Sequence, residues 1–267
     1  MLSGKVSFGI VASVIAIFFL SSCVRYENQG PAYSTGHGIG NGYNNHNSGY
    51  IGAISGHIHL YDQYGSPVTT GLAGIQVSLT GFSVTTITDN TGYYRFYNAP
   101  NGTYNLYVHD TSVAAPFADT KVLNVQLSGD SVIHDISLSA VPSFAPSSIS
   151  VTLDTTTKID SVVLTFTSNS KTRAGIVFVN NNSAVNNLPA NYLKVYTVSI
   201  PDSATSVSLS IPSSDLYNLG LASGSTVYLA AYGYVTTDYS VYEDYSTGKN
   251  IYNAVSTSSA TASAKVP

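Results

Sequence analysis

The stretch from residue 56 to residue 108 decides the fold, with GHIHLYDQYGSPVTTGLAGIQVSLTG at 56–81 and TTITDNTGYYRFYNAPNGTYNLYV at 85–108. Apolar and polar residues alternate here in short runs, as in successive β-strands. Turns at 62–65, 89–92 and 99–102 each combine an Asx or Pro residue with a glycine that can take a positive φ. Over 51–140 the pattern predicts seven strands, near 53–61, 74–80, 83–88, 93–98, 103–109, 120–126 and 131–138.

The turn and core residues of this stretch also form a recognisable set. They are Gly56, Asp62, Gly65, Pro67, Gly74, Val77, Leu79, Thr88, Asp89, Gly92, Tyr94, Phe96, Pro100, Gly102, Thr103 and Tyr104. With them the stretch resembles the carboxypeptidase regulatory-like domain family. The resemblance implies a transthyretin-like, seven-stranded sandwich over 51–140, an accessory module of secreted and outer-membrane proteins without catalytic machinery of its own. The insertion TTGL at 69–72 departs from the family pattern and lengthens one loop.

A second region follows a break at 140–146, AVPSFAP, whose two prolines predict a semi-rigid interdomain linker. The segment LGLASGSTVY at 219–228 resembles the approach to strand F in fibronectin type III and related immunoglobulin-like domains. The resemblance implies a second sandwich over 147–267. Its strands are expected near 148–153, 161–167, 175–180, 193–200, 206–211, 225–235 and 254–264.

Composition supports an all-β fold of two β-sandwich domains in tandem. Charged residues make up only 9% of the 267 residues, and Tyr, with 21 copies, is abundant while strong helix formers are scarce. The net charge is −4 and no Lys/Arg cluster is present, so nucleic acid is not an expected partner. The single cysteine excludes an internal disulfide and any multi-thiolate metal site.

The N-terminal residues predict export and lipid anchoring. Lys5 precedes an apolar run at 6–20 that suits a signal-peptide core and is short for a membrane span. LSSC at 20–23 then resembles the bacterial lipobox, which implies cleavage after residue 22 and acylation of Cys23, palmitate included. Val24, where Asp would signal inner-membrane retention, favours the outer membrane. The alternative is an ordinary secretory signal with a free thiol.

Residues 23–50 are rich in Gly and Asn and show no periodicity, which predicts a disordered tether between the lipid anchor and the first sandwich. Such a tether would hold the sandwiches at the cell envelope, on the periplasmic or the outer face. The expected partner of this end of the chain is therefore the membrane.

The motifs of common enzymes are missing from the sequence. It contains no Gly-x-Ser-x-Gly elbow, no His-Glu-x-x-His and no P-loop, so no catalytic residue and no cofactor are expected. His57 and His59 share one strand face and would hold a metal only with a third ligand such as His109 or His134. We expect instead that both imidazoles face water, that no metal binds, and that 89–92 is a hairpin turn.

Tyrosines are the candidate binding residues. Alternation places Tyr94 and Phe96 in the core and Tyr93, Arg95 and Tyr97 on the exposed face, with Tyr107 of the next strand at the parity to join them. Exposed Tyr and Arg are typical of recognition patches. A second concentration, at Tyr228, Tyr232, Tyr234, Tyr239, Tyr242, Tyr245 and Tyr252, surrounds a predicted loop at 237–250. The alternative is that Tyr simply replaces charge on a low-lysine surface.

Three functions remain open at this point. The favoured one is a non-catalytic, lipid-anchored binding or spacer protein that contacts glycan or another envelope protein. The second is a structural subunit of an adhesive or nutrient-uptake assembly. The third, an enzyme, requires a site assembled from residues distant in sequence.

Overall fold

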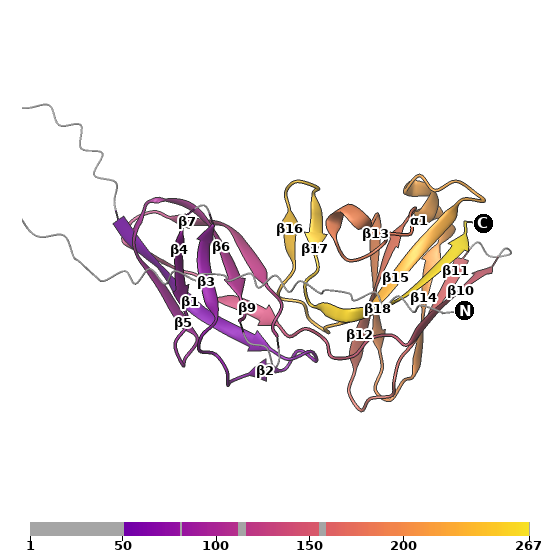
Figure 1. Cartoon of the computed structure of the whole chain (residues 1–267), viewed down its shortest axis with the longest axis horizontal. Coiled ribbons are helices and arrows are strands. Elements are labelled where there is room, and N and C mark those ends of the chain that lie inside the picture. Colours follow the sequence, from indigo (N-terminus) through magenta and orange to yellow (C-terminus); the bar gives the residue numbers. More distant parts are fainter. Residues whose placement is uncertain (1–50, 81, 112–115, 155–158, 267) are drawn as a thin grey trace, which may run out of the picture. The chain divides into compact units, whose positions relative to one another are not determined.

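A computed structural model describes residues 51–80, 82–111, 116–154 and 159–266, which belong to one compact unit (Figure 1). These residues form two β-sandwiches, so the predicted all-β class is confirmed. The predicted signal peptide at 1–22, the lipidation site Cys23 and the tether at 23–50 lie outside the described residues.

The first sheet of the first sandwich is built around one long strand, β1. This strand pairs with every other member of the sheet: antiparallel with β2 and β5, and parallel with β8 and β9. The sheet consists of β1 (Ile51–Tyr61), β2 (Pro67–Val68), β5 (Tyr93–Pro100), β8 (Ser131–Ile133) and β9 (Ile136–Ser139).

The second sheet runs in the order β4-β3-β6-β7. Strands β5 and β6 are consecutive but belong to opposite sheets, and the chain crosses between them at Asn101. The hydroxyl of Tyr104 donates a hydrogen bond to the Pro100 carbonyl at this corner. The sheet consists of β3 (Gln76–Thr80), β4 (Val84–Ile87), β6 (Gly102–His109) and β7 (Thr120–Leu127).

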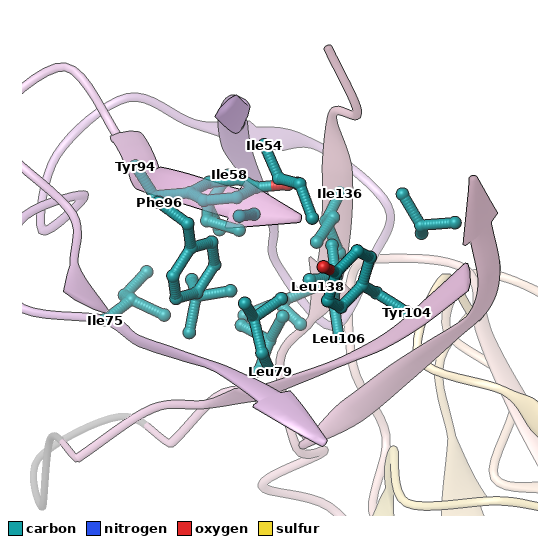
Figure 2. Close-up of a cluster of buried hydrophobic side chains, with 14 of the residues drawn as sticks. Ile54, Ile58, Ile75, Leu79, Tyr94, Phe96, Tyr104, Leu106, Ile136 and Leu138 are labelled. Carbon is teal, nitrogen blue, oxygen red and sulfur yellow. The ribbon is translucent and has the colours of Figure 1, made fainter. Parts of the chain in front are cut away.

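The core of the first sandwich follows from the alternation in the sequence. Ile58 and Leu60 point inward from β1, and Tyr94 and Phe96 point inward from β5, as predicted. Figure 2 shows Ile58, Tyr94 and Phe96 meeting side chains of the opposite sheet such as Leu79 and Leu106. Each fully buried side chain of this size contributes about 1.5–3 kcal/mol to folding, so this cluster holds the two sheets together.

The predicted strand at 131–138 is in fact two strands, β8 and β9, interrupted at His134 and Asp135. The interruption is fixed from both sides: the His134 N–H donates to Ser55 O over 2.8 Å, and His134 O accepts from the Tyr94 hydroxyl over 2.6 Å. A Cβ on Gly56 would lie 2.0 Å from His134 O, so this close approach requires glycine.

The second sandwich has seven long strands, all at the predicted places. One sheet runs β10-β11-β14 and the other β13-β12-β15-β18. The strands are β10 (Ser148–Asp154), β11 (Ile159–Thr165), β12 (Arg173–Asn180), β13 (Lys194–Ile200), β14 (Ser206–Pro212), β15 (Thr226–Tyr234) and β18 (Val255–Lys265).

Five short elements were not predicted: β2 in the first sandwich, and four others after β12. A 3-10 turn, η1 (Pro189–Asn191), precedes β13, and a short helix, α1 (Ser213–Asn218), follows β14. The predicted loop at 237–250 contains a hairpin of β16 (Tyr242–Asp244) and β17 (Lys249–Ile251), drawn in yellow in Figure 1. In the part of the chain that the structure describes, no helix has the length and apolar character needed to cross a membrane.

The predicted linker at 140–146 is packed against the second sandwich. Phe144 lies in an edge contact with Phe166, with ring centroids 6.3 Å apart, and the Arg173 guanidinium lies 5.4 Å from the Phe144 ring. A Cβ on Gly233 would lie 1.9 Å from Phe144 O. The linker is therefore fixed by glycine and aromatic packing as well as by its prolines.

Buried serines join the segment after β15 to the first sandwich. Ser240 is fully buried; its Oγ accepts from the Ser139 N–H over 3.0 Å and donates to Ala118 O over 3.2 Å. Ser139 is also fully buried; its Oγ accepts from the Tyr239 N–H over 2.9 Å and donates to Thr237 O over 3.1 Å. Each hydroxyl thus satisfies two buried backbone groups.

Ser240→Ala is expected to lower the free energy of unfolding by about 1–3 kcal/mol, because it leaves a buried N–H and a buried carbonyl without partners. Urea unfolding of the two proteins measures the difference. Ser223→Ala, at an exposed turn of the second sandwich, is the control and should change stability by less than about 0.5 kcal/mol. Equal losses in both variants would contradict the role of the Ser240 hydroxyl.

Candidate functional site

Three of the four predicted binding residues lie together. Tyr93, Arg95 and Tyr97 follow one another on the outer face of β5, and Tyr97 is 70% exposed. The Arg95 guanidinium lies 4.7 Å from the centre of the Tyr97 ring, and the Tyr93 ring lies 5.3 Å from that of His57 on β1. These residues form an exposed aromatic row on the first sheet.

The prediction that Tyr107 joins this row is wrong. Tyr107 has the expected parity, but its strand β6 belongs to the opposite sheet, so its side chain projects from the other side of the sandwich. The crossing at Asn101 is the physical cause, because strand parity alone does not reveal which sheet the next strand enters.

The two histidines of β1 lie on the outer face, as predicted, with about half of each side chain exposed. Both imidazoles lie 3.8 Å from the Asp135 carboxylate, which also accepts from the His57 N–H over 2.8 Å. His109 lies on the opposite sheet, where it contacts Asp119. Among the described residues, no group of three or more His, Cys, Asp or Glu side chains is arranged to hold a metal ion.

Tyr107 instead forms a row across the second sheet with Ser78 and Lys121. The register places Ser78 opposite Tyr107, and Tyr107 opposite Lys121, so all three side chains share the outer face. This row, with the hairpin side chain Tyr242, forms the floor and one wall of an open hollow of about 510 Å³. Its lining residues are Ser78, Leu79, Thr80, Phe82, Tyr107, Lys121 and Tyr242.

A second hollow, of about 200 Å³, continues from the first because both share Thr80, Lys121 and Tyr242. We call the two hollows together the junction groove: one side is the second sheet of the first sandwich and the other is the β16–β17 hairpin. The second hollow is lined by Thr80, Asn105, Lys121, Leu123, Tyr242, Glu243, Asp244, Tyr245 and Ile251.

Asp119 fixes the orientation of the Tyr107 ring. The Tyr107 hydroxyl donates to one oxygen of Asp119, and His109 Nδ1 lies 2.8 Å from the other. The Tyr107 and His109 rings are nearly parallel, at 8° and 6.3 Å. Burial, reinforced by the bond to Asp119, raises the pKa of the Tyr107 hydroxyl well above its usual range. Tyr107 therefore stays a neutral phenol with a fixed ring.

Lys121 lies between the two aromatic walls. Its Nζ is 5.9 Å from the centre of the Tyr107 ring and 5.6 Å from that of Tyr242. Burial raises the pKa of the Tyr242 hydroxyl, although a bond with Asn253 opposes the shift. Asn253 in turn donates to Asp119 O over 2.8 Å, so the same side chain links the hairpin region to the first sandwich.

The hairpin wall is stiffened by its own turn. The Asp244 carboxylate accepts hydrogen bonds from Thr247 Oγ1 at 2.8 Å and Ser246 Oγ at 2.9 Å, and these bonds hold the pKa of Asp244 below its usual range. At the tip, Asn124 of β7 donates to the Tyr245 hydroxyl over 3.0 Å. The groove therefore has two walls that are joined by hydrogen bonds at both ends.

The second tyrosine concentration is spread over different surroundings: Tyr239 packs on Tyr61 with ring centroids 4.3 Å apart, and Tyr228 packs against a buried cluster of the second sandwich. Tyr232 and Tyr252 pack on Phe178 with ring centroids 5.6 Å away in each case, and Tyr234 is also buried. These tyrosines cover the outer face of the β13-β12-β15-β18 sheet, so they are core residues and not binding residues. Only Tyr242 and Tyr245 reach the groove.

No family model matches the chain, and no curated protein matches it. The resemblance of the first region to the carboxypeptidase regulatory-like family therefore stays a prediction.

Several solved structures are similar over parts of the chain. A protein from Bacteroides uniformis, provisionally described as carbohydrate-binding, is 17% identical over 81% of this chain and 100% of its own, with a TM-score of 0.30. A DUF3823 family protein from Parabacteroides merdae is 15% identical over 78% and 98%, with a TM-score of 0.29. A type II cohesin–X-dockerin complex from Acetivibrio cellulolyticus is 21% identical over 34% of this chain and 57% of that chain, with a TM-score of 0.26. These values assign neither a family nor an activity to this chain.

Asp238, at the base of the hairpin segment, has an unusual carboxyl group. Its Oδ1 accepts from the Ser240 N–H over 2.7 Å, and the carboxyl group is largely buried. Burial raises the pKa of Asp238 above 3.8, although bonds from Ser240 and Tyr234 oppose the shift. The folded protein therefore binds this proton more tightly than the unfolded chain does, and the stabilising contribution is lost as pH rises through the folded-state pKa.

Asp238→Asn should therefore be more stable than the parent protein at pH 7, with the difference vanishing below about pH 4, where the Asp carboxyl is protonated in both states. Thermal unfolding from pH 3 to pH 8 measures the difference. Asp244→Asn is the contrasting control: because its pKa is lowered, that variant should be less stable at pH 7 and equal to the parent at low pH. Two variants that shift stability in the same direction at pH 7 would contradict these assignments.

Proposed function

We propose that this protein is a non-catalytic, lipid-anchored protein of the bacterial cell envelope that binds glycan in the junction groove. The observation that carries the proposal is the placement of Lys121 between the rings of Tyr107 and Tyr242 in an open hollow of about 510 Å³. This volume falls within the range of about 300–1,000 Å³ that is usual for ligand sites.

The chemistry of the groove suits a sugar. A pyranose ring has an apolar face of C–H groups, which pack on the negative face of an aromatic ring, and a rim of hydroxyls that need donors and acceptors. Tyr107 and Tyr242 offer the ring faces, Lys121 offers donors, and Asn105 offers an amide. The fixed Tyr107 ring lowers the entropy lost on binding.

Two carboxylates near the groove, those of Asp119 and Asp244, favour binding over catalysis. Asp119 is bonded to both Tyr107 and His109, and Asp244 is bonded within its turn and has a lowered pKa. A general acid for glycoside cleavage needs a raised pKa and access to the ligand. Asp238, whose pKa is raised, is absent from the lining of the groove.

The location follows from the proposed acylation of Cys23, which would attach the protein to the outer membrane through several acyl chains and so hold it firmly. The sandwiches would face either the periplasm or the exterior. The exposed row of Tyr93, Arg95 and Tyr97 is then a second proposed contact surface, directed at another envelope protein.

A structural role is the second candidate function. The fully buried Ser139 and Ser240 and the packed Phe144 favour it, because they join the two sandwiches without a free hinge. A rigid pair of sandwiches suits a subunit of an adhesive or nutrient-uptake assembly. Co-purification of stoichiometric envelope partners from detergent extracts would favour this role, whereas binding of purified protein to glycan favours the first.

Tyr242→Ala is expected to weaken glycan binding at least tenfold, about 1.4 kcal/mol, because it removes one aromatic wall. A glycan array probed with the acylated protein in detergent identifies the ligand, and affinity is then measured by titration. Tyr242→Phe keeps the ring and should bind within a few-fold of the parent, as should Tyr97→Ala on the opposite sheet. Undiminished binding by folded Tyr242→Ala would exclude the groove as the site.

Cys23→Ala is expected to abolish incorporation of labelled palmitate and to move the protein from the membrane fraction to the soluble fraction. Ser22→Ala keeps a small residue before the cysteine and should be labelled like the parent. Proteinase treatment of intact cells then assigns the face of the outer membrane. Persistent labelling of Cys23→Ala would contradict acylation at this residue.

A further inference from the structure

The charges around the junction groove are unequal. Its lining contains one cationic side chain, Lys121, and two anionic ones, Glu243 and Asp244, both on the β16–β17 hairpin. Asp119 adds a further carboxylate behind the Tyr107 ring. The described lining of the groove contains no arginine. A ligand in this groove therefore meets a surplus of negative charge.

The negative charge is fixed in place. Asp244 accepts hydrogen bonds from the Ser246 and Thr247 side chains and from the Ser246 N–H, at 2.8–3.1 Å. These donors stabilise the ionised carboxylate and keep it from taking up a proton when an anion approaches. Glu243, the preceding residue of β16, is exposed and also lines the groove.

The ammonium group of Lys121 contacts two aromatic rings of the groove. The Lys121 ammonium lies 5.9 Å from the centre of the Tyr107 ring and 5.6 Å from that of Tyr242. Recognition of a carboxylate or sulfate usually uses a bidentate arginine fork, which a single lysine does not reproduce. Lys121 is thus suited to donate hydrogen bonds to hydroxyl and ring oxygens.

We propose that the junction groove selects uncharged polysaccharide chains and rejects chains that carry carboxylates or sulfates. This inference rests on the proposed glycan-binding function of the same groove. The two aromatic rings attract any pyranose, while Glu243 and Asp244 repel an acidic one, so selectivity comes from a repulsive element added to a general attraction. An interaction of this kind between solvent-exposed charges weakens as salt is added.

The test uses matched polysaccharides with the full-length, acylated protein in detergent. The first pair is unmodified dextran and carboxymethyl dextran. The second is galacturonan in its methyl-esterified form and in its free-acid form. For each pair that binds, the uncharged member should bind at least tenfold more tightly at low salt. The ratio of the two affinities should fall in 0.5 M NaCl. Glu243→Gln should raise the affinity for the charged member and so lower the ratio of the two affinities.

The matched control is Asp130→Asn, which removes one negative charge from an exposed loop outside the groove lining. In this variant the ratio of the affinities for uncharged and charged chains should equal that of the parent protein. Charged chains that bind as tightly as uncharged ones, with both lost in Tyr242→Ala, would overturn the selectivity and leave glycan binding standing. Failure of the parent protein to bind any polysaccharide on the array or in these pairs would overturn both proposals.

Discussion

The buried contact between Ser139 and Ser240 sets the position of the hairpin segment on the first sandwich, and the junction groove depends on that position. The two serine hydroxyls form hydrogen bonds with four backbone groups there. In a buried position, a polar group without a partner costs more free energy than a typical hydrogen bond contributes. Because these bonds are directional, they specify a register between the sandwiches that apolar packing alone would leave less well defined. The wall that carries Tyr242 is placed by this register.

Tyrosine has three different uses in this chain. Tyr232 and Tyr252 pack on Phe178 in the core of the second sandwich. Tyr242 presents its ring face in the groove, and Tyr97 is part of the exposed row on β5. The phenol suits all three because it combines a large apolar ring with one polar atom. With charged residues at only 9%, such residues also provide much of the polar surface, so the count of tyrosines by itself does not identify a site.

Local sequence pattern predicted the strands well and the candidate site poorly. Alternation placed Tyr94 and Phe96 in the core and Tyr97 outside, since these properties depend on neighbours one or two residues away. It misplaced Tyr107, because the crossing between sheets at Asn101 leaves parity unchanged. It also missed β16 and β17, whose three residues each are too short to show a period. The groove joins residues about 120 positions apart, which no local pattern encodes.

The order in which the chain is made gives the pairing of β1 another meaning. Domains generally fold in order from the N-terminus during synthesis, yet β1 receives its parallel partners only when β8 and β9 have been made. Contacts between distant residues form slowly, and the last wall of the groove comes from residues 242–251. A partly synthesised chain therefore holds a nearly finished first sandwich without the hairpin wall, so the proposed groove is complete only once residues 242–251 have joined it.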